Sequence, residues 1–66
     1  MINDNTTKTI LLVEDEAIIS IVITKTLKRF GYNVLNAGSG EKAVELSFSN
    51  DTIDLVLMDI DLGSGI

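Results

Sequence analysis

The stretch that decides the fold is LVLMDIDLGSGI, residues 55–66, in which four apolar residues run directly into Asp59. A second carboxylate follows at Asp61, and a glycine-rich segment comes after it. A short apolar run bounded by turn residues indicates a strand. The acid at its end could cap the loop, act as the nucleophile of a phosphatase, or accept a phosphoryl group.

Upstream of this stretch, the apolar pattern alternates between strand and helix. The predicted elements, in chain order, are strand 9–14, helix 16–30, strand 32–37, a turn and helix within 38–49, and strand 53–58. The strands are short apolar runs, and the helices show apolar residues at three- and four-residue steps. Gly31 predicts the end of the first helix, and Ser39 or Gly40 is expected to cap the second. This alternation predicts an α/β fold of two βαβ units with a parallel sheet.

The apolar residues also predict which elements are buried. The first strand, TILLVE, is expected to be buried on both faces, as strands of parallel sheets are. The first helix carries more apolar residues than a single core-facing stripe needs, and most of them are expected to pack against the sheet. Its last turns hold Lys25, Lys28 and Arg29, which suit the negative end of the helix dipole.

Composition excludes several classes of function. The chain has 66 residues, enough for one small core, and contains neither cysteine nor histidine. Disulfides, thiolate metal sites and imidazole ligands are therefore excluded. A net charge of −5 disfavours direct contact with nucleic acid. No apolar run reaches the roughly 18 residues of a membrane span, and the polar N-terminus is no secretory signal, so we expect a cytoplasmic protein.

The strand arrangement indicates an incomplete domain. Residues 1–8 are expected to be a flexible lead-in, and residues 9–66 the N-terminal part of a doubly wound domain. The strand at 53–58 is apolar on both faces, which calls for helices on both sides and a further strand beside it. The sequence supplies two helices, so we expect the rest of the domain to follow Ile66.

Acidic side chains follow two of the predicted strands. Glu14 and Asp15 end the first strand, and Asp59 ends the third. Ligands of open parallel sheets bind at the carboxyl ends of the strands. If these two strands are neighbours, the acids lie about one strand spacing, roughly 4.8 Å, apart and disfavour joint ionisation. An all-oxygen site of this kind favours Mg²⁺, with Mn²⁺ or Ca²⁺ as alternatives. The competing interpretation is that Asp15 caps the first helix.

Taken together, these motifs resemble one known family. LLVEDE before a helix, GSGEKAVEL at the second helix and VLMDIDLGSG at the third strand are similar to the receiver domain of two-component response regulators. The resemblance covers nearly the whole chain after Lys8. It implies the first half of a flavodoxin-like doubly wound domain with strand order 2-1-3.

The resemblance also implies roles for the acids. Asp59 would be the phosphoacceptor, taking a phosphoryl group from the phosphohistidine of a histidine kinase. Asp15 would bind Mg²⁺ directly, Glu14 would bind it through water, and the backbone carbonyl of Asp61 would complete the protein ligands. Such a chain is a signalling acceptor rather than a turnover enzyme.

The sequence departs from the family pattern in two ways. Receiver domains typically use a Ser or Thr that ends the fourth strand and a Lys that ends the fifth, and neither strand is present. The common Met-Pro after the acceptor is replaced by Leu62–Gly63. The first departure is expected to impair phosphorylation.

Two other functions stay open. DIDLG resembles the DxDxT/V motif of haloacid-dehalogenase-type phosphatases, with Asp59 as nucleophile and Asp61 as general acid. That motif normally ends the first strand of its fold, and Gly63 stands where Thr or Val is expected. Alternatively, the chain is a phosphorylation-independent interaction module that uses the acids as a metal or structural site.

The first helix is the expected contact for a partner protein. In receiver domains this helix commonly docks the histidine kinase or histidine phosphotransferase. We expect Ile19 or Ile23 to remain exposed for that contact. The output domain cannot be predicted from this segment.

Overall fold

A computed structural model describes residues 7–59 of the chain. The elements are β1 (Thr9–Val13), α1 (Ala17–Arg29), β2 (Asn33–Ala37), α2 (Gly40–Ser49) and β3 (Leu55–Met58). The predicted order of strands and helices is therefore confirmed, with ends that differ by one or two residues. Most of the predicted lead-in, and everything after Asp59, lies outside the described residues.

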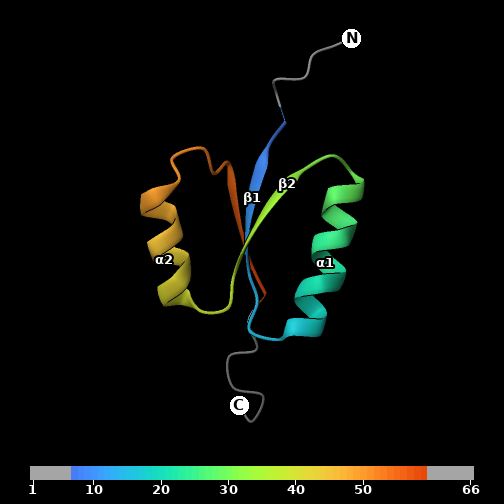
Figure 1. Cartoon of the computed structure of the whole chain (residues 1–66), viewed down its shortest axis with the longest axis horizontal. Helices are drawn as coiled ribbons and strands as arrows, with labels where there is room; N and C mark the ends of the chain where they lie inside the picture. The colour runs from blue at the N-terminus through green and yellow to red at the C-terminus, as the bar shows by residue number, and fades with distance from the viewer. Residues whose placement is uncertain (1–6, 60–66) are drawn as a thin grey trace.

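The three strands form one parallel sheet in the order β2-β1-β3, as expected. The chain moves from β1 to β2 in one direction and then crosses back past β1 to β3. With right-handed crossovers, this reversal places the two helices on opposite faces of the sheet. Figure 1 shows α1 and α2 on either side of the strands. The reversal between β1 and β3 is the switch point at which such sheets bind ligands.

Strand β1 is the centre of the core, and its predicted burial on both faces is confirmed. Leu11 and Val13 pack with Ala37 and Ala43 on the α2 side. Leu12, which alternates with them and is 0% exposed, faces the other side of the sheet. Strand β1 pairs with β2 at one edge and with β3 at the other, so both of its edges are hydrogen-bonded within the sheet.

Helix α1 packs less completely than its sequence suggests. None of its residues is buried, and Ile18, Ile21 and Val22 are more than half exposed. The half-buried residues follow helical spacing and are Ser20, Ile23, Thr24 and Leu27. The prediction that most apolar residues of this helix pack against the sheet is therefore wrong. The inward stripe includes two hydroxyl residues because β2 presents the amide of Asn36 to them.

The helix ends follow local chemistry. Gly31 adopts φ +95°, a left-handed conformation that glycine reaches without strain, and it ends α1 as predicted. Ser39 caps α2, because its hydroxyl accepts a hydrogen bond of 3.1 Å from the Lys42 N–H. Glu41 lies in the first turn of α2, where the helix dipole favours an acid.

Strand β3 is an outer strand. Its four residues, Leu55–Met58, are all exposed, between 37% and 63%. The helices pack over β1 and β2 rather than over β3. None of the helices among residues 7–59 is both long and apolar enough to cross a membrane.

Candidate functional site

The backbone brings the two acidic strand ends together. Val13 pairs with Met58 across the β1–β3 ladder. The Asp59 N–H then donates to the Val13 carbonyl at 2.8 Å. On the other side of β1, the Glu14 N–H donates to the Ala37 carbonyl at 3.0 Å. Glu14 and Asp59 thus occupy neighbouring positions at the carboxyl edge of the sheet.

The start of β3 is fixed by a reciprocal pair of hydrogen bonds. The Asp54 N–H donates to the Thr9 carbonyl, and the Asp54 Oδ2 accepts from the Thr9 N–H, both at 2.8 Å. Pairing at this end sets the register of the whole strand. Five residues further on, that register places Asp59 beside the end of β1.

Glu14 is a buried carboxylate. Only 5% of the residue is exposed, and its Oε2 accepts a hydrogen bond of 2.8 Å from the Glu16 N–H. That hydrogen bond lowers the pKa of Glu14. Burial, the side-chain hydrogen bond with Asp15, and the charges of Asp59 and Asp15 act in the opposite direction, and the net pKa is raised. The three carboxyl groups therefore interact electrostatically, and a cation placed among them would favour the ionised form of Glu14.

Asp15 and Asp59 are exposed, in contrast to Glu14. The helix-capping interpretation of Asp15 is wrong, because the N-cap of α1 is Glu16 and no side-chain hydrogen bond caps the helix. Asp15 is thus left available for another role. Asp61, whose carbonyl was predicted to bind the metal, lies outside the described residues.

The donor chemistry at this edge fits a hard cation, although the described residues do not complete a site. Within residues 7–59, no group of three or more Asp or Glu side chains is arranged to hold a metal ion. The oxygens available are the carboxylates of Glu14, Asp15 and Asp59. Mg²⁺ commonly binds through one or two carboxylates and retains several waters, so a partial protein ligand set is compatible with it.

A hollow of about 350 Å³ opens beside the acids, between the start of α1 and the end of β2. Glu14 and Asp15 lie at one end of it, and Ser20 and Asn36 line its wall. Asn36 was not singled out from the sequence, because an asparagine in a short strand carries no specific signal. Its Nδ2 donates to the hydroxyls of Ser20 and Thr24, at 3.0 and 2.8 Å.

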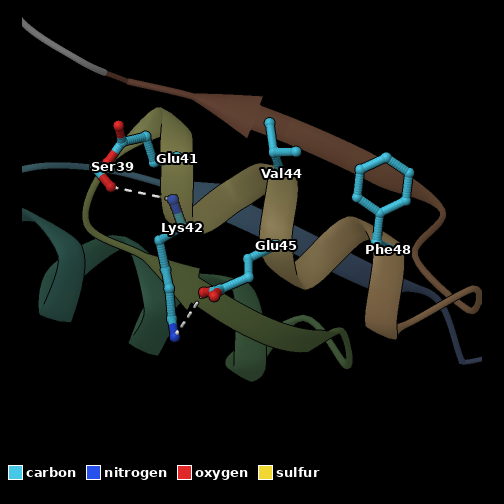
Figure 2. A pocket seen from close by; sticks show the side chains of 6 residues that line it. All are labelled: Ser39, Glu41, Lys42, Val44, Glu45 and Phe48. Atoms are coloured by element: carbon cyan, nitrogen blue, oxygen red, sulfur yellow. Dashed lines mark hydrogen bonds and ion pairs between the residues drawn. The ribbon is translucent and has the colours of Figure 1, made fainter.

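A larger hollow, of about 500 Å³, lies elsewhere, on the outer surface of α2 (Figure 2). Figure 2 shows the Ser39 cap and the ion pair of 3.3 Å between Lys42 Nζ and Glu45 Oε1. Glu41, Val44 and Phe48 complete its lining, and all three are exposed. None of the predicted site residues lines this hollow, so it is not assigned to the site.

The two residues predicted for partner docking lie on α1. Ile19 is 40% exposed, and Ile23 is half-buried. Both have surface that a partner could contact, and their role in docking stays a prediction.

Comparison with known proteins identifies relatives of the chain. The sequence of residues 10–65 matches the family model of the response regulator receiver domain. An uncharacterised transcriptional regulatory protein, YrkP of Bacillus subtilis, is 45% identical over 77% of this chain and 21% of its own length. A cyclic di-GMP phosphodiesterase of Thermotoga maritima is 44% identical over 82% of this chain and 14% of its own.

The autoinducer 1 sensor kinase/phosphatase LuxN of Vibrio campbellii is 36% identical over 89% of this chain and 7% of its own length. The chain thus spans about one fifth or less of each of these three relatives. No solved structure matches the chain significantly.

Proposed function

The chain belongs to the response regulator receiver domain family, and on that premise we propose that Asp59 accepts a phosphoryl group from a phosphohistidine. The donor is a histidine kinase or a histidine phosphotransferase. A carboxylate oxygen of Asp59 attacks phosphorus, the bond between phosphorus and the histidine nitrogen breaks, and histidine leaves. The product is an aspartyl phosphate, formed once per chain, so the protein is a signalling acceptor.

The hydrogen bond between the Asp59 N–H and the Val13 carbonyl, 2.8 Å long, is the observation that best supports this proposal. It holds an exposed carboxylate next to the two acids that end β1. The acceptor is therefore accessible to a partner protein, and Glu14 and Asp15 supply two further carboxylates near it.

The proposed cofactor is Mg²⁺, with Mn²⁺ as an alternative. Asp15 and Asp59 would hold it directly, Glu14 through water, and the Asp61 carbonyl would complete the set. Bound there, the ion would reduce the repulsion between the acceptor carboxylate and the anionic phosphoryl group. Glu14 is buried and oriented by the Glu16 N–H, which suits an indirect ligand.

The partner is proposed to dock on α1, next to the acids. Ile19 and Ile23 are its expected apolar contacts, because both retain exposed surface on the helix that follows Asp15. The cytoplasmic location expected from the sequence also stays a prediction.

Acetyl phosphate with Mg²⁺ tests the acceptor without a partner protein. Uptake of one phosphoryl group, measured by intact mass, should be partial, because residues 1–66 do not include the Ser or Thr and the Lys of the later receiver strands, and Asp59→Asn should abolish it. Asp51→Asn is a matched control, because this exposed aspartate lies before β3, at the opposite end of that strand. Retained phosphorylation in Asp59→Asn would refute the assignment.

The same preparation separates the alternatives. Repeated hydrolysis of p-nitrophenyl phosphate would indicate the phosphatase. Binding of Mg²⁺ with neither phosphorylation nor beryllofluoride binding would indicate the interaction module. Uptake of one phosphoryl group, with beryllofluoride binding that requires Mg²⁺, is the result expected for a receiver.

A further inference from the structure

Two adjoining hollows form one groove between α1 and β2, which we call the α1–β2 groove. The first is the hollow beside Glu14 and Asp15. The second, also about 350 Å³, is lined by Ser20, Ile21, Thr24, Lys25, Lys28 and Asn36. Ser20, Ile21 and Asn36 line both hollows, so the two are continuous along the helix.

The floor of the groove offers hydrogen-bond donors. Asn36 Nδ2 donates to both Ser20 Oγ and Thr24 Oγ1, so each hydroxyl is already an acceptor. Among residues 7–59, neither hydroxyl proton has an acceptor of its own. A hydroxyl can accept and donate at once, so both protons are available to an anionic or carbonyl oxygen.

The two ends of the groove carry opposite charge. Lys25 and Lys28 lie at one end, and neither forms an ion pair within the described part of the chain. Glu14 and Asp15 lie at the other end. Strand β2, NVLNA, contributes no charge to the wall. Ile21, 54% exposed, lies between the two ends as an apolar contact.

We propose that the α1–β2 groove binds an acidic segment of a partner protein. Carboxylates of the segment would pair with Lys25 and Lys28 and accept from the Ser20 and Thr24 hydroxyls. An apolar side chain would lie on Ile21, and the end of the segment nearest Asp15 would be uncharged or basic. This surface goes beyond the proposed function, since it requires no phosphoryl transfer.

Charge complementarity selects this occupant over other anions. A nucleic acid would carry phosphates along the whole groove and would meet Glu14 and Asp15. A peptide can place its acids at one end only. From Ala17 to Lys28 helix α1 rises about 17 Å, which about five extended residues span.

The test is a titration of the full chain, labelled with ¹⁵N, with two synthetic peptides of about six residues. One has three glutamates, a leucine and an uncharged end, and the other replaces the glutamates with glutamines. Saturable shifts at Ser20, Thr24, Lys28 and Asn36 with the acidic peptide alone are expected. They should weaken at high salt, because exposed charge pairs are screened.

Charge-reversed variants provide the matched comparison. Lys25→Glu with Lys28→Glu should weaken binding by about tenfold or more, since each exposed pair contributes a factor of about 1.4 to 5 and reversal adds repulsion. Lys8→Glu with Lys42→Glu has the same net charge but leaves the groove intact, and should bind as the parent does. Asp59→Asn should also bind normally, which separates this surface from the proposed phosphoacceptor.

Equal weakening in both double variants would overturn the proposal, because net charge alone would then explain binding. The absence of saturable shifts in the groove would overturn it as well. Tighter binding of an oligothymidylate or of phosphatidylglycerol vesicles to the same residues would replace the acidic segment with another class of partner.

Discussion

Asp54 provides the sharpest test of how β3 is held in place. Its side chain accepts from the Thr9 N–H and its backbone donates to the Thr9 carbonyl, both at 2.8 Å. Thr9 is 9% exposed, so Asp54→Ala leaves a largely buried N–H without its acceptor. The expected loss is about 1–3 kcal/mol of unfolding free energy. For a chain of this size the total is roughly 3–10 kcal/mol, so the loss is a substantial fraction.

Urea denaturation followed by circular dichroism measures this loss. With a slope of about 1 kcal/mol/M, typical of a small protein, the midpoint should fall by roughly 1–3 M. Asp54→Asn keeps an oxygen acceptor and should lose less than Asp54→Ala. Faster hydrogen exchange at the Asp59 N–H in Asp54→Ala would show that the register of the whole strand depends on this pair. An alanine variant as stable as the parent would refute the reasoning.

Three further predictions test the core, the cap and the acidic edge. Leu12→Ala should cost about 2–5 kcal/mol in thermal or urea unfolding, whereas Phe48→Ala, at an 86% exposed position, should change stability by less than about 0.5 kcal/mol. Ser39→Ala removes the cap of α2 and should cost about 0.5–2 kcal/mol, with Ser47→Ala as the near-neutral control. Folding raises the pKa of Glu14 above 4.5, so stability should fall as pH rises from 4.5 through the raised pKa. Urea midpoints measured from pH 4.5 to 7 should show that fall, and Glu14→Gln should remove it.

The fold was predictable because the sequence patterns are strong and local. TILLV is a continuous apolar run and is buried on both faces, as a central parallel strand requires. Gly31 ends α1 through its left-handed conformation, and Ser39 caps the start of α2 through a hydrogen bond. Both effects depend on few neighbouring residues. Periodicity, glycine and a serine cap therefore sufficed for the order of the elements and for the strand arrangement.

The packing of α1 was not predictable by the same means. Its apolar residues are spread around the helix, so the sequence does not specify which stripe faces the sheet. The hydroxyls of Ser20 and Thr24 face the sheet because both accept hydrogen bonds from Asn36. Asn36 lies on β2, which is distant from these residues in the sequence and comes beside them only in the folded chain. Long-range polar contacts of this kind leave no periodic pattern. The N-cap of α1 was misjudged for a related reason, since the Glu14 side chain takes the Glu16 N–H and Asp15 is not needed as a cap.

The acids at the sheet edge divide into a buried one and two exposed ones, and this difference suits the proposed chemistry. Glu14 is held by burial and by the Glu16 N–H, so it cannot reach a partner protein. Within residues 7–59, Asp59 is bonded through its backbone N–H to Val13, and its carboxylate is exposed. The buried Glu14 can contribute negative charge to the site, while the exposed Asp59 reacts with the phosphoryl donor. Burial raises the pKa of Glu14, and the side-chain hydrogen bond with Asp15 and the charges of Asp59 and Asp15 add to that rise. A bound divalent cation would supply positive charge there, and for that reason metal binding and phosphoryl acceptance should both fail when Glu14 and Asp15 are neutralised together.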